Sequence, residues 1–304
     1  MSTQLSSRTT AVEAVAVSPA PRPDVRRRGS RRRPRMSRVL VYAALLIAVL
    51  VTILPFVWMY LGSVKTQQEL IRRPPTWWPE TITWDNFVAW FTRLDFGTFF
   101  YNSVVVAGFT VIGTLLFCSL VGYALAKLEF AGKRALFALV LVTLMVPGVV
   151  TFIPLFVVIS NLGMVSTHAA LILPFLAGPL GVFLMRQFIN EIPDALIEAA
   201  RIDGANELRI FATIVLPLCK PALATLAILT FLGSWNNFLW PLVVAQSEDM
   251  YTLPVALSLY SVGQNATNYG VLLAGSVLVI TPVLLLFIAL QRYFIQGIAV
   301  TGIK

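Results

Sequence analysis

Charged residues in this chain are gathered into clusters, and the stretches between the clusters are long and apolar. Five stretches contain no Asp, Glu, Lys or Arg, and they cover residues 39–64, 96–126, 135–185, 221–247 and 250–291. A helix needs about 20 apolar residues to cross the hydrocarbon core of a bilayer, so the third stretch is long enough for two crossings. Polar, turn-forming residues divide it near Asn161 and also occupy the start of the fifth stretch.

The pattern therefore predicts an all-α membrane protein with six transmembrane helices. They are expected at residues 39–62, 100–126, 136–160, 168–187, 219–242 and 270–292. Lys and Arg favour the cytoplasmic side of a membrane, and 19 of the 23 basic residues lie at the two ends and at the second and fourth connections. Both termini are therefore predicted to be cytoplasmic.

Composition excludes the main soluble alternatives. Charged residues make up 12% of the chain, about half the share of soluble proteins, and mean hydropathy is +0.81. So few charges cannot cover a water-facing surface, which argues against a soluble enzyme, a disordered chain and a disulfide scaffold. The two cysteines, Cys118 and Cys219, are expected to be small packing residues, because their spacing matches no metal or redox motif.

Residues 1–37 form a basic arm with two runs of three arginines. Such runs also occur in nucleic-acid-binding segments and before cleaved export signals. The apolar run that follows is longer than a signal-peptide core, and no small-residue cleavage site follows it. We therefore expect an uncleaved signal anchor whose disordered arm lies near anionic lipid and binds no nucleic acid. The membrane domain would cover residues 38–304.

Away from their ends the expected spans contain no charged residue, although ionisable residues inside a span usually mark ion or proton relays. The single histidine, His168, is placed at the start of the fourth span, where a solvated helix cap is the plainer interpretation. A Walker A loop, an HExxH motif and a Ser–His–Asp set are all absent, so we expect no catalytic residue and no metal site. Prolines predict bends in or beside the spans, at Pro55, Pro147, Pro154, Pro174, Pro179, Pro241 and Pro282.

The loop at 188–218 differs from the rest, because it predicts two short helices. The first begins at Pro193 with Asp194 in its first turn, and both residues are favourable there. It ends at Gly204, where a left-handed residue is favoured. The second is expected at about 206–215.

The first of these helices is amphipathic. Ala195, Ala199 and Ile202 form a narrow apolar stripe, and on the other side Glu198 and Arg201 are three apart and could pair. The helix could lie in the lipid headgroup layer, but anionic lipid would repel its acidic face. Docking into a groove on a cytoplasmic partner explains the small residues better.

The spacing within this loop resembles the EAA loop of the permease subunits of ATP-binding-cassette (ABC) importers. The matching positions are Glu198, Ala199, Ala200, Gly204, Ile214, Leu216 and Pro217, and Asp203 also fits. Stretches at 124–127, 146–155, 234–242 and 292–304 are similar to the carbohydrate-uptake branch, and closest to the maltose-type permease. The resemblance covers residues 38–304.

This resemblance implies a type I permease core in a bacterial or archaeal inner membrane. The segment from Glu198 to Gly204, with Arg201, would be a coupling helix that docks on a cytoplasmic ATPase dimer. ATP and Mg would be bound there, and this chain would bind no cofactor. The other partners would be a second, similar permease and an extracytoplasmic solute-binding protein. The tail would reach the ATPases through residues that include Gln296, Gly297, Gly302 and Lys304.

The function implied is ATP-driven import of a sugar or oligosaccharide. Aromatic rings and amides suit a sugar path, and four lie close together in the fifth span: Trp235, Asn236, Asn237 and Trp240. An interhelical amide bridge with interfacial tryptophans would show the same pattern. The alternatives are the same machinery carrying glycerol phosphate, an ion-coupled secondary transporter, and a membrane scaffold without a substrate.

Overall fold

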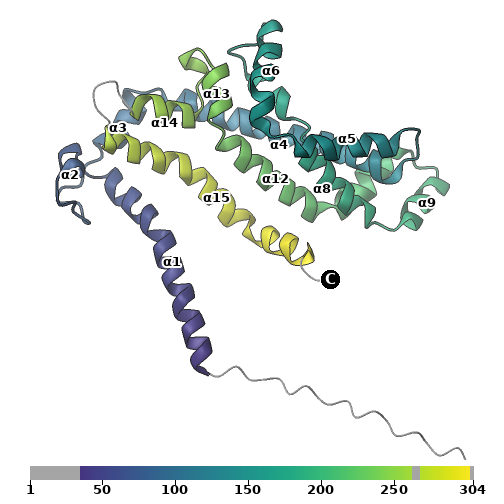
Figure 1. The fold of residues 1–304 in the computed structure, drawn as a ribbon, viewed down its shortest axis with the longest axis horizontal. Helices are drawn as coiled ribbons and strands as arrows, with labels where there is room; N and C mark the ends of the chain where they lie inside the picture. Colours follow the sequence, from purple (N-terminus) through teal and green to yellow (C-terminus); the bar gives the residue numbers. More distant parts are fainter. Residues whose placement is uncertain (1–34, 262–267, 302–304) are drawn as a thin grey trace, which may run out of the picture. The chain divides into compact units, whose positions relative to one another are not determined.

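The computed structural model describes the backbone of residues 35–261 and 268–301 and the side chains of residues 39–260 and 268–289. Every regular element in these ranges is a helix, and they contain no strand, in agreement with the all-α prediction (Figure 1). The chain divides into two units, Met1–Val51 and Thr52–Lys304, and the second contains every buried residue of the described part. The predicted basic arm lies almost entirely outside the described residues.

Three helices are long and apolar enough to cross a membrane: α1 (Arg35–Ser63), α4 (Phe96–Lys127) and α15 (Tyr269–Thr301). Three further pairs of helices reach the required length and hydropathy only together, because each pair is bent at its junction. The described residues therefore contain three candidate spans, or up to six if each bent pair crosses once. The predicted number of six spans equals the higher of these two counts.

The bent pairs lie in the middle of the chain. The first joins α5 (Lys133–Met145) to α6 (Gly148–Asn161) at 103°. In the second, α7 (His168–Ile172) and the 3-10 turn η1 (Leu173–Phe175) meet α8 (Pro179–Asn190) at 43°. The third joins α10 (Glu207–Ile210), the π-helical turn η2 (Phe211–Val215) and α11 (Leu216–Leu218) to α12 (Lys220–Trp235) at 81°.

The predicted third span, 136–160, is not one straight helix. The residue before a proline disfavours helical backbone, and Val146 is extended, with ψ 118°. Pro147 is extended too, and it lacks the N–H that a continuing helix would use. The predicted bend at this proline is confirmed, but it is large enough to divide the span into two short helices.

The predicted fifth span, 219–242, is also interrupted. Helix α12 ends at Trp235, and residues 236–238 separate it from α13 (Leu239–Val244). Two further short elements follow that the hydropathy pattern did not predict, η3 (Glu248–Met250) and α14 (Leu253–Ser261).

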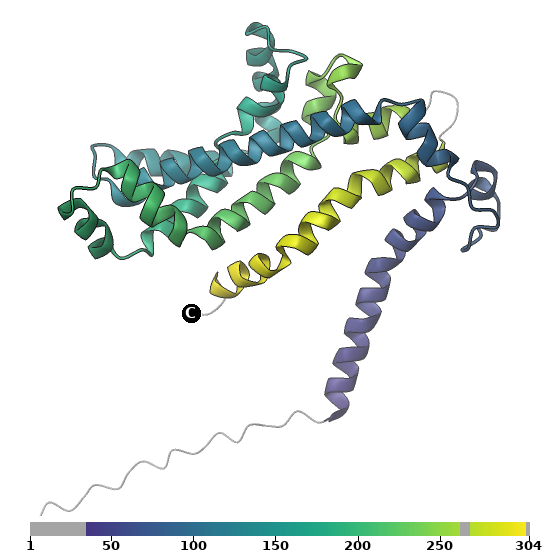
Figure 2. The same cartoon turned by 180° about the vertical axis from the view of Figure 1, so that it is seen from behind.

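Helix α4 packs against α8 and α12, and α12 packs against α15 (Figures 1 and 2). Small residues allow α4 and α8 to approach closely. A Cβ atom added at Gly181 would lie 2.7 Å from Cys118 Sγ, and one added at Gly122 would lie 2.9 Å from Met185 Cβ. Cys118 is buried in this contact, as expected for a packing residue. Helix α4 is therefore held by its packing against α8 and α12.

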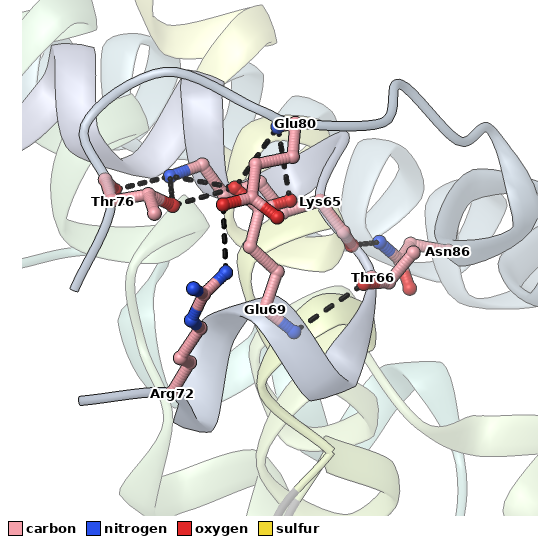
Figure 3. A network of polar contacts seen from close by, with 7 residues as sticks. All are labelled: Lys65, Thr66, Glu69, Arg72, Thr76, Glu80 and Asn86. Atoms are coloured by element: carbon pink, nitrogen blue, oxygen red, sulfur yellow. Dashed lines mark hydrogen bonds and ion pairs between the residues drawn. The ribbon is translucent and has the colours of Figure 1, made fainter. Parts of the chain in front are cut away.

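Two short helices between α1 and α4, α2 (Gln67–Ile71) and α3 (Asp85–Thr92), were not predicted. A network of polar contacts holds the segment around them (Figure 3). Lys65 is only 1% exposed. Its ammonium donates to the Thr76 carbonyl and also to the Thr76 hydroxyl, the latter at 3.1 Å. Its ammonium lies 3.6 Å from the carboxylate of Glu69, which accepts from the Thr76 hydroxyl at 2.6 Å and from the Glu80 N–H at 3.1 Å.

The same segment contacts the start of α15. Asn86 donates from Nδ2 to the carbonyl of Lys65 at 2.8 Å, and a Cβ atom added at Gly270 would lie 2.3 Å from its Oδ1. Trp90 is fully buried and donates from Nε1 to the carbonyl of Val271 at 2.9 Å. The ends of the first and last long helices are therefore joined through this segment.

His168 is half-buried and is not the solvated cap that the sequence predicted. Asn102 donates from Nδ2 to the carbonyls of Asp249, at 2.7 Å, and Tyr251, at 3.0 Å. Its Oδ1 therefore acts as the acceptor for His168 Nε2, 2.9 Å away. The histidine therefore ties α7 to α4.

Replacing Glu69 by Gln should destabilise the α2–α3 segment, because the Lys65 ammonium would stay buried without an opposite charge, which costs about 3 kcal/mol. Thermal unfolding of the purified protein measures this loss. The exposed pair of Glu80 with Arg72 provides the control. Because exposed ion pairs contribute little, Glu80→Gln should unfold close to the wild type. Equal unfolding temperatures for Glu69→Gln and the wild type would contradict the role of the network.

The wild-type network should also depend on acid. Burial raises the pKa of Glu69, but hydrogen bonds from Thr76 and the Glu80 N–H, with the charge of Lys65, outweigh burial and hold the pKa below its ordinary value of 4.5. A lowered pKa stabilises the fold above the ordinary value, and the contribution is lost as the pH falls through the lowered pKa. Unfolding temperature measured from pH 7 down to pH 3 should therefore fall more steeply below about pH 4.5 in the wild type than in Glu69→Gln.

Candidate functional site

The loop between α8 and α12 contains the short helix α9 (Asp194–Ile202), which begins one residue after the predicted start, because Pro193 is its N-cap. Asp194 lies in its first turn, and its Oδ1 is 2.6 Å from the Nζ of Lys127 at the end of α4. The same ammonium donates to the carbonyl of Ile192 at 2.6 Å. The hydrogen bond and charge of Lys127 lower the pKa of Asp194, which favours the ionised carboxylate. The start of α9 is thereby attached to α4.

The end of α9 is a left-handed turn at Gly204, as predicted, with φ +79°. The Gly204 N–H donates to the Arg201 carbonyl at 3.0 Å, and the Ala205 N–H donates to the Ala200 carbonyl at 2.9 Å. These two bonds form a Schellman motif, which satisfies the last carbonyls of a helix. No atom lies within 4 Å of a Cβ added at Gly204, so only the backbone conformation requires glycine within this chain.

The predicted ion pair between Glu198 and Arg201 is wrong. Arg201 pairs instead with Glu207, with 2.7 Å between Nε and Oε1. The Schellman turn reverses the chain, and this reversal brings the first residue of α10 back to the end of α9. The other oxygen of Glu207 accepts from the Tyr123 hydroxyl of α4 at 2.5 Å. The end of α9 is thus also attached to α4, through Glu207.

One face of α9 is packed against its own chain and the opposite face is open. Ile197 is 2% exposed and belongs to the buried core. On the open side Ile202 is 86% exposed, Leu208 after the turn is 70% exposed, and Ala199 is exposed as well. The predicted apolar stripe therefore faces outward. Glu198 is exposed too, and its side chain forms no hydrogen bond or ion pair within the described residues.

The predicted second helix of the loop is confirmed as α10 and its continuation to Leu218. Its N-cap is Asn206, whose Oδ1 accepts from the Arg209 N–H at 2.8 Å. Ile214 and Leu216 pack against the buried core cluster below α9, while Pro217 is exposed. Ile214 and Leu216 of the EAA-like pattern are therefore built into the core, whereas Glu198 and Ala199 are exposed.

A cavity of about 440 Å³ lies between α4, the α7–α8 pair and α12. Its polar lining consists of three threonines, a serine and an amide: Thr110, Thr114, Thr230, Ser234 and Asn237. None of the residues that line it carries a charge. Hydroxyl and amide groups in an otherwise apolar cavity suit an uncharged polar solute.

Two threonines of α4 behave differently in this cavity. The Thr114 hydroxyl donates to the Phe175 carbonyl at 3.1 Å. The Thr110 hydroxyl is buried and has no hydrogen-bond partner among the described residues. An unsatisfied buried hydroxyl costs about 1–3 kcal/mol. The sequence did not single out either threonine, because a threonine among apolar residues has no distinguishing spacing.

The structure brings one of the four predicted substrate-path residues to the cavity, namely Asn237. Trp235 is 2% exposed and donates from Nε1 to the Val279 carbonyl at 3.0 Å. Trp240 is 3% exposed and donates to the Ala170 carbonyl at 3.0 Å. Asn236 is exposed and donates to the Leu232 carbonyl of its own helix. Both indoles are therefore engaged in packing between helices.

The predicted ATPase-contacting tail lies mostly outside the described residues. Gln296 and Gly297 lie in α15, and their side-chain environment falls outside the described residues, as do Gly302 and Lys304 entirely. Within the described residues, no group of three or more His, Cys, Asp or Glu side chains could hold a metal ion.

Residues 118–300 match the model of the family described as "binding-protein-dependent transport system inner membrane component". The chain belongs to this family. The matched range contains the α9–α11 loop, most of the cavity lining and α15 as far as Val300. The chain is therefore a membrane permease component of the importer class that the EAA-like spacing had indicated.

Individual relatives cover nearly the whole chain. The arabinooligosaccharides transport system permease protein of Halalkalibacterium halodurans is 44% identical, over 89% of this chain and 98% of that protein. The lactose transport system permease protein of Rhizobium radiobacter is 35% identical, over 87% and 96%. Among solved structures, a bacterial ABC transporter involved in the import of the acidic polysaccharide alginate matches with a TM-score of 0.78 and 26% identity, over 86% of this chain and 99% of that one.

The stability of the left-handed turn at the end of α9 should depend on whether residue 204 tolerates a positive φ, and not on the size of its side chain. Valine at Gly204 should destabilise the turn by about 1–2 kcal/mol, the cost of a left-handed conformation, whereas asparagine, which tolerates that conformation, should cost less. Hydrogen exchange of the Gly204 and Ala205 amides in the reconstituted protein measures the difference. Equal protection in Gly204→Val and Gly204→Asn would show that the positive φ is not what requires glycine.

Proposed function

We propose that this chain is the permease subunit of an ABC importer that moves a sugar or oligosaccharide into the cytoplasm. The transport systems of its relatives are named for arabinooligosaccharides and lactose, and its own cavity is lined by hydroxyl and amide groups without a charge. The excess of Lys and Arg at the two ends and on the α9 side supports cytoplasmic termini. ATP and Mg would be bound by a separate ATPase dimer.

The observation that carries the proposal is the open face of α9. A surface that exposes Ile202 and Leu208 on a charged loop is typical of a protein–protein contact. Glu198 stands beside it without a hydrogen bond or ion pair among the described residues, so it is available to a positively charged group of another subunit. We therefore assign Glu198–Gly204 as the helix that docks on the ATPase. The second permease and the solute-binding protein complete the assembly.

A docked α9 can transmit movement because it is attached to α4 at both ends. The Lys127 pair lies at its start, and the bond from Tyr123 to Glu207 lies just beyond its end. Helix α4 is continuous from Phe96 to Lys127, and it contributes Thr110 and Thr114 to the cavity wall. Displacement of α9 would therefore tilt one wall of the cavity, which is the movement that alternating access requires.

The cavity also weighs against the alternatives. A secondary transporter usually couples to ions through ionisable residues within the membrane, and the cavity lining contains none. Glycerol phosphate would introduce a phosphate group, whose usual partners are Arg and Lys side chains or helix N-termini. Because no basic side chain of the described residues lines this cavity, the wall formed by this subunit fits a neutral solute better.

Charge reversal at Glu198 should abolish transport without unfolding the chain. Glu198→Lys places a positive charge on the docking face and breaks no hydrogen bond or ion pair of the described residues, so uptake should fall at least tenfold while unfolding temperature is retained. Glu191→Lys, an equal reversal in the same loop but outside the motif, is the matched control and should lose less. The measurements are solute uptake in proteoliposomes and co-purification of the ATPase. If Glu198→Lys retains both, the docking assignment is wrong.

Valine at Thr110 should separate solute binding from stability. The substitution keeps the shape and removes a hydroxyl that has no hydrogen-bond partner among the described residues, so unfolding temperature should stay equal or rise. If a solute hydroxyl is the missing partner, the KM for uptake should rise about fivefold, equivalent to ~1 kcal/mol. Thr114→Val, which removes a bonded hydroxyl, should lower stability instead. An unchanged KM in Thr110→Val would remove Thr110 from the path.

A further inference from the structure

A second cavity, of about 300 Å³, lies at the start of α5, apart from the solute cavity. It is lined by three basic residues, one acidic residue and one aromatic ring: Lys133, Arg134, Arg186, Glu129 and Phe137. We propose that this cavity binds the phosphate of an anionic phospholipid from the cytoplasmic leaflet. The proposal rests on the membrane placement and orientation given above, and not on the nature of the transported solute.

Arg186 is held in place at the cavity wall. Its guanidinium carbon lies 3.7 Å from the centre of the Phe137 ring, and its Nε donates to the Leu125 carbonyl at 3.2 Å. The terminal amino groups of the guanidinium have no partner among the described residues. A guanidinium that is oriented by a ring and a carbonyl, with donors to spare, is a favourable phosphate ligand.

The other two cations add charge that the cavity does not neutralise. The Lys133 ammonium lies 2.9 Å from the Glu129 carboxylate and is the only one of the three in an ion pair. Arg134 is exposed, and its side chain has no hydrogen bond or ion pair within the described residues. One carboxylate against three cations leaves a net charge of about +2 around a small cavity, which attracts an anion.

The surface beyond the cavity identifies a lipid as the source of that anion. Helix α5 has no buried residue, and Leu136, Leu139 and Val142 are 49%, 58% and 56% exposed along it. The basic residues thus stand at the beginning of an apolar helix face. An anionic headgroup in the cavity would leave its acyl chains along this face, whereas a free phosphate would gain nothing from it. Basic pockets between helices on the cytoplasmic side are where anionic headgroups bind.

The test uses the full-length chain purified with its partner subunits. Native mass spectrometry would compare retention of phosphatidylglycerol and phosphatidylcholine by wild type, Arg134→Gln and the double variant Lys133→Gln/Arg134→Gln. Phosphatidylglycerol should be retained preferentially, and each lost charge should weaken it about fivefold. Lys220→Gln is the matched control, because Lys220 is an exposed cation on the same side that does not line the cavity. Its retention should equal that of the wild type.

Three results would overturn the proposal. The first is equal retention of the two lipids by the wild type, and the second is an equal loss in Lys220→Gln, which would indicate only a diffuse surface charge. The third is displacement of the lipid by millimolar inorganic phosphate, since a free anion would then occupy the cavity as well. Solute uptake by Arg134→Gln is measured as well and should be retained, because the function proposed above does not require the lipid. A failure of the lipid proposal is thereby distinguished from a failure of the proposed function.

Discussion

The attachment of α9 to α4 is the contact on which the proposed mechanism depends. A short helix on a loop can transmit force only if its position relative to a span is determined. Here Lys127 pairs with Asp194 at the start of α9, and Tyr123 binds Glu207 just after its end. Two contacts at separate points determine direction as well as position. They also leave the outer face of α9 open, with Ile202 almost fully exposed.

Helix α4 connects this contact with the cavity between α4, the α7–α8 pair and α12. Its sequence reflects both the packing against its neighbours and the lining of that cavity. Small residues such as Gly122, packed on α8, let it sit tightly among its neighbours. A helix in lipid satisfies its own backbone groups, so its side chains alone determine which positions offer hydrogen bonds to the cavity. Among the described residues of α4, Thr110 is the one whose hydroxyl is buried without a hydrogen-bond partner. The part of the cavity wall that α4 forms thus offers hydroxyl groups.

Charged residues are used in opposite ways in the α2–α3 segment and in the segments around α9 and the start of α5. In the α2–α3 segment Lys65 and Glu69 are buried together, and nearly every donor and acceptor around them is satisfied. Such a network favours one conformation of the segment and leaves little for a partner. At the start of α5 and on α9, by contrast, Arg134 and Glu198 are unpaired within the described chain. The first arrangement supports the helix ends, and the second is suited to contacts outside the chain.

The sequence by itself determined the helical membrane fold, the EAA-like loop and the turn at Gly204, because hydropathy, helix-end chemistry and residue spacing are local properties. Only the tertiary structure decided which side chains meet. Arg201 pairs with Glu207 because the chain reverses between them, and the indoles of Trp235 and Trp240 bind carbonyls of helices distant in sequence. The 103° bend near Pro147 was likewise beyond a local pattern, since a proline permits a bend and its neighbours determine its size.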